Sequence, residues 1–446
     1  VISYHYAPEI VPRAFRWTSI AEYWAKLGNE VVVVSSWRPG IPRYEILNSV
    51  HVYRVGGSIS ESLRSWLRKP DIYMNCEAQN LNNLNNPRLA FKRIFARYAK
   101  LIHDSSWKKI YWPDFACLWY FPAVYKTKRL CRRQRYDAMV TVALPFTAHL
   151  VGLRLKHNHP DLIWLADSGD PFCFQEELPV NNNRLFKRLN FIAEREVFSR
   201  ADAITVTTKP TRDRYISLFP ENAQRLKIIP HLLIESRETS SGHSIFSDRT
   251  KTRLVYIGTL QKNIRSPHSL LILFSTLLKT RLDNKIELHL FGNISDCKPI
   301  FEPYQMLLGK SLFIHGIVPR EVALLAMNEA DILVNIGNKT PYQLPSKVVE
   351  YIASGKPILN VVQRESDSSA EFFSQYYPWC LSVVINHENL EPEVIERIVR
   401  FLESPPKIEQ HELEKYKNYF GIRSIAHQYM DLILRAYSLK HGNNEY

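Results

Sequence analysis

The sequence has few cysteines and no obvious redox or metal-binding pair among them. Its 446 residues include six cysteines, which are scattered and form no C-x-x-C motif. A chain of this length can stabilise itself by burying hydrophobic surface, so we do not expect a disulfide framework. The composition therefore favours a reducing, cytoplasmic location.

Long hydrophobic runs and the common hydrolase motifs are also missing. The longest uncharged apolar run, 115–125, is interrupted by Pro122 and is shorter than the roughly 18 to 20 residues that span a bilayer. The sequence contains no D-x-D, H-E-x-x-H or G-x-S-x-G motif. Divalent-metal catalysis and serine hydrolysis lack their usual signatures, and we predict neither a metal site nor another cofactor.

Positive charge exceeds negative charge. The chain has 58 Lys and Arg against 44 Asp and Glu, a net charge of +14, which implies an anionic partner. The segment 88–135, the basic block, holds thirteen Lys and Arg against two Asp, with seven Trp, Tyr and Phe residues between 107 and 121. Cations mixed with amphipathic aromatics suit an anionic membrane surface. A solvated helical face is the simpler alternative; nucleic acid is not predicted, because no nucleic-acid-binding motif accompanies the charge.

The order of the predicted elements indicates two α/β domains. Short β-rich runs separated by helical stretches are typical of parallel sheets. They cover 1–3, 31–35, 50–55, 138–142, 162–166, 203–207 and 227–230, and then 254–257, 286–291, 312–315, 332–335 and 358–362. The polar segment 236–252 between the two sets is predicted to be a linker.

We therefore predict two doubly wound, Rossmann-like domains, an N-terminal acceptor-side domain over 1–235 and a C-terminal domain over 253–411. The segment 412–440 is predicted to be a helix whose apolar face packs back on the first domain. Ligands of such domains bind at the carboxyl ends of the strands, so two of them are expected to face a cleft.

The segment 345–358 is the most informative stretch of the chain. Ser346 is expected to cap a helix that Gly355 ends, and the apolar run 358–362 follows as a strand. A helix start attracts phosphate, and Lys347 lies beside it. Glu350, one turn on, could bind the two hydroxyls of a ribose, or it could be an ordinary solvated residue.

Two other loops carry candidate ligand-binding residues. Gly258 follows the first strand of the second domain and lets a ligand approach the backbone, while Lys262 and Arg265 can clamp a diphosphate. In the first domain, Asp167 and Asp170 lie just past a predicted buried strand. An ordinary glycine turn and a pair of turn-capping carboxylates are the alternatives.

Several motifs together resemble those of bacterial glycosyltransferases of family 4. They are Tyr-Ala-Pro-Glu-Ile-Val-Pro-Arg-Ala-Phe-Arg-Trp over 6–17, Asp-Ser-Gly-Asp-Pro-Phe over 167–172, Val-Tyr-Ile-Gly over 255–258 and the segment 345–357. Four positions depart from the family pattern: Val11 and Pro12 stand where many members have a glycine pair, Tyr342 where many have Glu, and Thr259 where many have Arg. The resemblance runs nearly end to end and implies a GT-B fold.

The resemblance also implies roles for individual residues. Glu350 would bind the ribose of a nucleotide diphosphate sugar, and Ser346 and Lys347 would hold its diphosphate. The remaining expected donor contacts are Gly258, Lys262, Arg265, Pro12 and Arg13. The pair of Asp167 and Asp170 is assigned to catalysis, with Asp170 orienting the acceptor or stabilising charge at the reacting carbon.

The expected function is that of a retaining glycosyltransferase in surface glycan synthesis. It would move a sugar from a nucleotide diphosphate sugar to a saccharide or lipid-linked acceptor, without metal, on the inner face of the cell membrane. Two alternatives remain open: a nucleotide-sugar epimerase or hydrolase of the same fold, and an inactive scaffold subunit that binds nucleotide or membrane.

Overall fold

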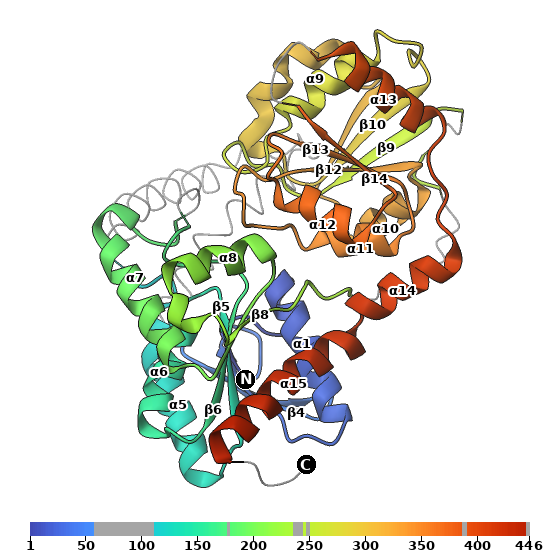
Figure 1. Cartoon of the computed structure of the whole chain (residues 1–446). Coiled ribbons are helices and arrows are strands. Elements are labelled where there is room, and N and C mark those ends of the chain that lie inside the picture. Colours follow the sequence, from blue (N-terminus) through green and yellow to red (C-terminus); the bar gives the residue numbers. More distant parts are fainter. Residues whose placement is uncertain (58–110, 176–178, 235–243, 247–249, 386–389, 443–446) are drawn as a thin grey trace, which may run out of the picture. The chain divides into compact units, whose positions relative to one another are not determined.

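The structure is a computed structural model that describes residues 1–57, 111–175, 179–234, 244–246, 250–385 and 390–442 (Figure 1). It divides into two compact units. Unit 1 comprises Val1–Ile229 and Ile425–Tyr446, and unit 2 comprises Pro230–Ser424. The predicted linker 236–252 lies partly outside the described residues. Phe246, which is described, is buried in the core of unit 2.

Unit 1 is built on an eight-stranded sheet of order β3-β4-β2-β1-β5-β6-β7-β8. The strands are β1 (Ile2–Ser3), β2 (Val32–Ser36), β3 (Tyr44–Leu47), β4 (Val50–Val55), β5 (Ala138–Ala143), β6 (Ile163–Ser168), β7 (Ala203–Val206) and β8 (Leu226–Ile228). β3 pairs antiparallel with β4, and the other pairings are parallel. The sequence predicted the parallel strands but missed β3, whose side chains stay largely exposed at the sheet edge.

The helices of unit 1 are α1 (Pro12–Lys26), α5 (Tyr120–Arg133), α6 (Thr147–Asn158), α7 (Asn183–Arg200), α8 (Lys209–Leu218) and α15 (Ile422–His441), with short 3-10 turns η4 (Cys117–Trp119) and η5 (Pro220–Asn222). Helices α5, α6 and α7 pack in one layer (Figure 1). Helix α15 lies against α1, where Trp24 Nε1 donates to the carbonyl of Ala426 over 3.1 Å.

Unit 2 repeats the α/β pattern with a six-stranded parallel sheet of order β11-β10-β9-β12-β13-β14. Its strands are β9 (Thr252–Ile257), β10 (Ile286–Phe291), β11 (Leu312–Gly316), β12 (Ile332–Ile336), β13 (Ile358–Val362) and β14 (Cys380–Val384). Its helices are α9 (His268–Leu277), the 3-10 element η6 (Ser295–Leu307), α10 (Arg320–Glu329), α11 (Lys347–Ala353), α12 (Ser368–Tyr376), α13 (Pro392–Glu403) and α14 (Gln410–Phe420). The predicted class of two doubly wound α/β domains is confirmed.

Two local predictions were wrong. The tail is not one helix over 412–440 but two, α14 and α15, interrupted at Gly421, whose extended backbone has a ψ of 162°. Ser346 lies at the start of α11 but caps no backbone N–H with its side chain, because its backbone is already helical, with φ −59° and ψ −27°. Gly355 does follow the helix, with a φ of +69°.

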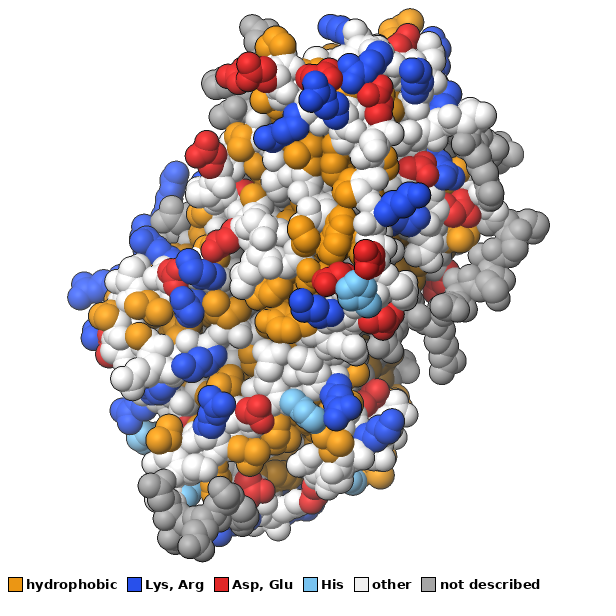
Figure 2. Space-filling model, turned by 45° about the vertical axis from the view of Figure 1, so that its right-hand side comes forward, with side chains coloured by type: hydrophobic (Ala, Val, Ile, Leu, Met, Phe, Trp, Pro, Cys, Tyr) orange, Lys and Arg blue, Asp and Glu red, His pale blue; other side chains and the backbone are white. Residues whose placement is uncertain are grey.

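Positive charge is not confined to one part of the surface. Figure 2 shows Lys and Arg side chains spread over the face drawn there, among hydrophobic and uncharged ones. Of the basic block, residues 88–110 lie outside the described residues, and the remainder runs through η4 and α5. No helix in the described parts of the chain is both long and apolar enough to cross a membrane.

Candidate functional site

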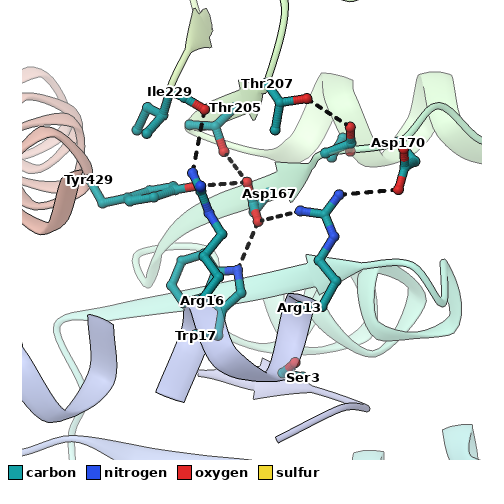
Figure 3. A network of polar contacts seen from close by, with 12 residues as sticks. Ser3, Arg13, Arg16, Trp17, Asp167, Asp170, Thr205, Thr207, Ile229 and Tyr429 are labelled. Carbon is teal, nitrogen blue, oxygen red and sulfur yellow. Dashed lines mark hydrogen bonds and ion pairs between the residues drawn. The ribbon is translucent and has the colours of Figure 1, made fainter. Parts of the chain in front are cut away.

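The two predicted carboxylates lie where β6 ends. All six residues of β6 are buried, which fixes the strand firmly in the sheet of unit 1. Asp167 is its fifth residue and points into a polar network, and Asp170 follows two residues after the strand (Figure 3). The carboxyl end of a central parallel strand is the usual position of a ligand-binding residue in this kind of domain.

Asp167 is completely enclosed by hydrogen-bond donors. One oxygen accepts from Thr205 Oγ1 at 2.8 Å and from Tyr429 OH at 2.9 Å, and the other accepts from Trp17 Nε1 at 2.8 Å. Burial opposes its ionisation, but Arg13 and Arg16 with these hydrogen bonds outweigh burial and hold the pKa of Asp167 below its ordinary value. Asp167 is therefore a permanent anion with little capacity to take up a proton.

Asp170 has a different environment. It exposes 37% of its side chain, and one oxygen meets Arg13 Nη2 at 3.3 Å, while Arg13 Nη1 lies 3.6 Å from Asp167 (Figure 3). Burial lowers the pKa of Arg13 and the two carboxylates raise it, with a net rise. Arg13 thus joins a buried carboxylate to one that solvent and a ligand can reach.

Gly169 makes room for this guanidinium. A Cβ at position 169 would stand 1.7 Å from Arg13 Nη2, so no residue with a side chain fits there while Arg13 keeps its place. Pro12 and Arg13 open α1, where the proline occupies the first turn. Both were predicted as donor contacts, and the structure places Arg13 on the aspartates of its own unit.

No pattern in the sequence indicated the partners that surround Asp167. Tyr429 comes from α15, 262 residues away, and its hydroxyl also accepts from Arg16 Nη2 at 2.8 Å. Tyr429 belonged to the apolar face predicted for the tail, and only the packing of α15 on α1 shows that its hydroxyl has a polar role. Trp17 lies inside the opening motif that resembles family 4 glycosyltransferases, but the sequence indicated no role for it.

A buried histidine contacts the end of β6 and the neighbouring strand β5. His149 of α6 contacts Thr141 Oγ1 at 2.7 Å and Ser168 Oγ at 3.0 Å. Burial lowers its pKa to about 3, so the ring is neutral near pH 7 and holds the end of β6 without adding charge.

In unit 2, three predicted donor residues lie together. Lys347 Nζ donates to the carbonyl of Ile257 at 2.5 Å and lies 2.9 Å from where a Cβ of Gly258 would be. Arg265 donates from Nε and Nη2 to Asn338 Oδ1, at 3.1 and 2.9 Å. Burial away from water, and after it the positive charge of nearby Arg265, holds the pKa of Lys347 well below its ordinary value. A bound anion would stabilise the charged amine.

The other predicted donor residues are less closely placed. Glu350 is partly exposed, and its Oε1 pairs with Arg320 Nη2 of α10 at 2.8 Å. Lys262 is exposed. Ser346 is half-buried beside Lys347. Arg320 was not predicted, since nothing in the sequence indicates that α10 contacts α11. Among the described residues, no group of three His, Cys, Asp or Glu side chains is arranged to hold a metal ion.

Comparison with known proteins supports the class of protein that these features indicate. Residues 93–233 match the family model described as Glycosyltransferase Family 4, which confirms the resemblance found in the sequence. No curated protein sequence matches the chain.

Solved structures of similar fold cover nearly the whole chain. A glycosyltransferase from Rickettsia africae ESF-5 superposes with a TM-score of 0.57 at 11% identity, covering 99% of this chain and 98% of its own. WaaG, a glycosyltransferase involved in lipopolysaccharide biosynthesis, has a TM-score of 0.53 at 14% identity, covering 99% and 100%. The N-terminal domain of Candida albicans trehalose-6-phosphate phosphatase has a TM-score of 0.56 at 11% identity, covering 98% and 96%. The fold is GT-B, and the family match supports glycosyl transfer as the class of reaction.

Proposed function

We propose that the protein is a retaining glycosyltransferase that moves a sugar from a nucleotide diphosphate sugar to a saccharide or lipid-linked acceptor. The observation that carries this proposal is the arrangement of Lys347 and Arg265 around Gly258 at the end of β9. Two cations beside a glycine that leaves the backbone accessible suit a diphosphate.

In the proposed mechanism, unit 2 supplies the charge that the leaving diphosphate needs. Lys347 and Arg265 neutralise negative charge as the bond to the sugar breaks, which stabilises the transition state electrostatically. Glu350 would accept hydrogen bonds from the ribose, and its ion pair with Arg320 orients the carboxylate. No metal is assigned a role.

Unit 1 supplies the acceptor side of the proposed reaction. Asp170 orients the acceptor hydroxyl or stabilises positive charge at the anomeric carbon, and Asp167 acts through Arg13 as a positioning residue. The proton of the acceptor hydroxyl passes to the departing phosphate. In this proposal the accessible carboxylate of Asp170 takes part in the reaction, and the buried carboxylate of Asp167 holds Arg13 in place.

Ligand binding tests the donor site. A panel of nucleoside diphosphates should contain one that stabilises the protein by about 2.7 kcal/mol at 100 times its dissociation constant. Lys347→Ala and Arg265→Ala should weaken binding of that diphosphate more than binding of the bare nucleoside, because both residues are assigned to phosphate. Lys279→Ala, at an exposed position beyond α9, is the matched control. Equal losses for both ligands would remove the two cations from the phosphate site.

Turnover separates the proposal from its alternatives. A transferase should release nucleoside diphosphate rapidly only when both donor and acceptor are present. Consumption of the donor alone would indicate a hydrolase or epimerase. Tight binding without turnover, with every acceptor tested, would indicate a scaffold subunit.

We also propose that unit 1 associates with an anionic membrane surface on the cytoplasmic side. Helix α5 carries five Lys and Arg and no acidic residue, and Phe121 and Tyr125 expose 69% and 68% of their surface. Each cation near an anionic surface contributes about 1 kcal/mol. Reversing Lys128, Arg129, Arg132 and Arg133 to Glu should release the protein from anionic vesicles in cosedimentation, without weakening nucleotide binding. Equal cosedimentation of parent and variant at low salt would exclude this surface.

A further inference from the structure

Unit 1 has two adjoining pockets that are lined by none of the residues assigned above to the reaction. The first, the apolar groove, has a volume of about 660 Å³ and is lined mainly by Trp112, Leu118, Tyr120, Phe121, Leu150 and Leu153. The second, the basic pocket, has a volume of about 490 Å³ and is lined at the end of α5 by Arg132, Arg133 and Arg135, and by His159. Pro160 lines both pockets, so they are neighbours.

The apolar groove is open and accessible. Leu118 and Phe121 on its wall expose 49% and 69% of their surface. Its volume is within the range of small-molecule sites. Two of its charged residues already have partners: Lys156 Nζ bonds Asp202 at 2.5 Å, and Arg200 pairs with Glu196 at 3.1 Å. The groove therefore presents apolar walls rather than unsatisfied charges along most of its length.

The basic pocket has the opposite character. Among the described residues, no salt bridge joins Arg132, Arg133 or Arg135 to an acidic residue, although Asp137 and Asp161 also line the pocket. Upstream on α5, Lys126, Lys128 and Arg129 add positive charge. Arg132, Arg133 and Arg135 thus bring three positive charges to one pocket. A negative ligand group bound there would reduce the repulsion among them.

We propose that the apolar groove and the basic pocket form one site for an anionic phospholipid, the groove taking an acyl chain and the basic pocket the phosphate. Charge complementarity at one end and apolar walls at the other match the two parts of such a lipid. The proposal rests on the membrane association in the proposed function and deepens it, because it replaces general attraction to a surface with a saturable site for one lipid.

The direct test uses a lipid that dissolves as single molecules. Dihexanoyl phosphatidylglycerol below its micellar concentration should bind the full chain with one molecule per protein, detected by native mass spectrometry and calorimetry. Dihexanoyl phosphatidylcholine should bind with an affinity lower by about tenfold or more, since it lacks net negative charge. Glycerol phosphate should not bind measurably. Absence of saturable binding, or equal binding of the neutral lipid, would overturn the proposal.

Variants locate the site. Leu118→Trp and Leu153→Trp fill the groove, and Arg132→Glu with Arg135→Glu reverses the pocket's charge; each change should weaken phosphatidylglycerol binding about tenfold or more. Leu118 is half exposed, so Leu118→Trp keeps the test valid if Leu153→Trp misfolds.

The controls are Leu189→Trp, on an exposed part of α7 outside the groove, and Lys227→Glu on β8. Unchanged binding in both groove-filling variants would mean surface adsorption only and would overturn the site.

Nucleoside diphosphate binding, measured on the same variants, distinguishes the lipid-site proposal from the glycosyltransferase proposal. No residue assigned to donor binding lines either pocket, so nucleoside diphosphate binding should be the same in all these variants. Lipid binding that depends on the groove would support the lipid site even if no glycosyl transfer is found.

Discussion

Asp167 and Asp170 are three residues apart but lie in different surroundings. Asp167 is buried among hydrogen-bond donors, whereas Asp170 exposes more than a third of its side chain and pairs with Arg13. The spacing of the two residues in the sequence cannot tell which aspartate is buried, whereas the exposed fraction of each side chain in the structure does.

Exchange of each aspartate for asparagine should therefore give different results. Asp167→Asn should cost about 3 to 5 kcal/mol of stability, because it leaves Arg13 and Arg16 beside a neutral group in the protein interior. Asp170→Asn should change stability by about 1 kcal/mol or less but lower turnover about 100-fold with donor affinity unchanged. Urea unfolding and steady-state rates measure the two effects; full activity in Asp170→Asn would make the pair a structural turn.

Lys347 should make donor binding depend on pH. Its lowered pKa means that the free protein loses the ammonium charge at a lower pH than an ordinary lysine does, and a bound diphosphate would raise that pKa again. Binding then takes up a proton, so affinity should fall as pH rises through the pKa of free Lys347, by at most about tenfold per pH unit. Calorimetry in buffers of different ionisation enthalpy would detect the proton. Lys347→Met should abolish the pH dependence, and Lys279→Met should preserve it.

At the scale of elements, α15 serves unit 1 as part of its core. The ring of Tyr429 packs against Trp17 in a tilted arrangement with ring centroids 4.9 Å apart, while its hydroxyl hydrogen-bonds both Arg16 and Asp167. One residue of a late helix thus fixes both the first helix and the end of β6.

Tyr429→Phe keeps the ring and removes only the hydroxyl. It should destabilise unit 1 by about 1 to 3 kcal/mol, since two buried polar groups lose a partner. Tyr437→Phe on the same helix is the control, because Tyr437 is 40% exposed. Equal unfolding midpoints in denaturant for the two variants would show that the hydroxyl contributes nothing to the network.

At the scale of the whole molecule, the chain leaves unit 1 after Ile229 and returns to it at Ile425. Unit 2 is therefore continuous in sequence and unit 1 is not. The last segment covers Trp17 and Trp24 of α1, both of which are buried.

Removal of residues 425–446 should harm only one unit. Unit 1 should unfold at lower denaturant concentration and become sensitive to proteolysis, because α1 loses its apolar cover, while unit 2 should still bind nucleoside diphosphate. A chain ending at Gly442 is the control. Loss of nucleotide binding together with unit 1 stability would mean that the units depend on each other for folding.

The sequence by itself determined the fold class, most of the parallel strands and the candidate residues, because periodicity, glycine positions and buried runs are local signals. It missed the parallel strand β14 at the edge of the second sheet. It could not find the antiparallel β3, the break at Gly421 or the failure of Ser346 to cap, since edge exposure and backbone geometry depend on neighbours. Only the tertiary structure decided which partners each charge has: Tyr429 on Asp167, Arg13 between two aspartates and Arg320 on Glu350. These pairs join residues up to 262 positions apart, and such contacts arise from packing, which no local pattern encodes.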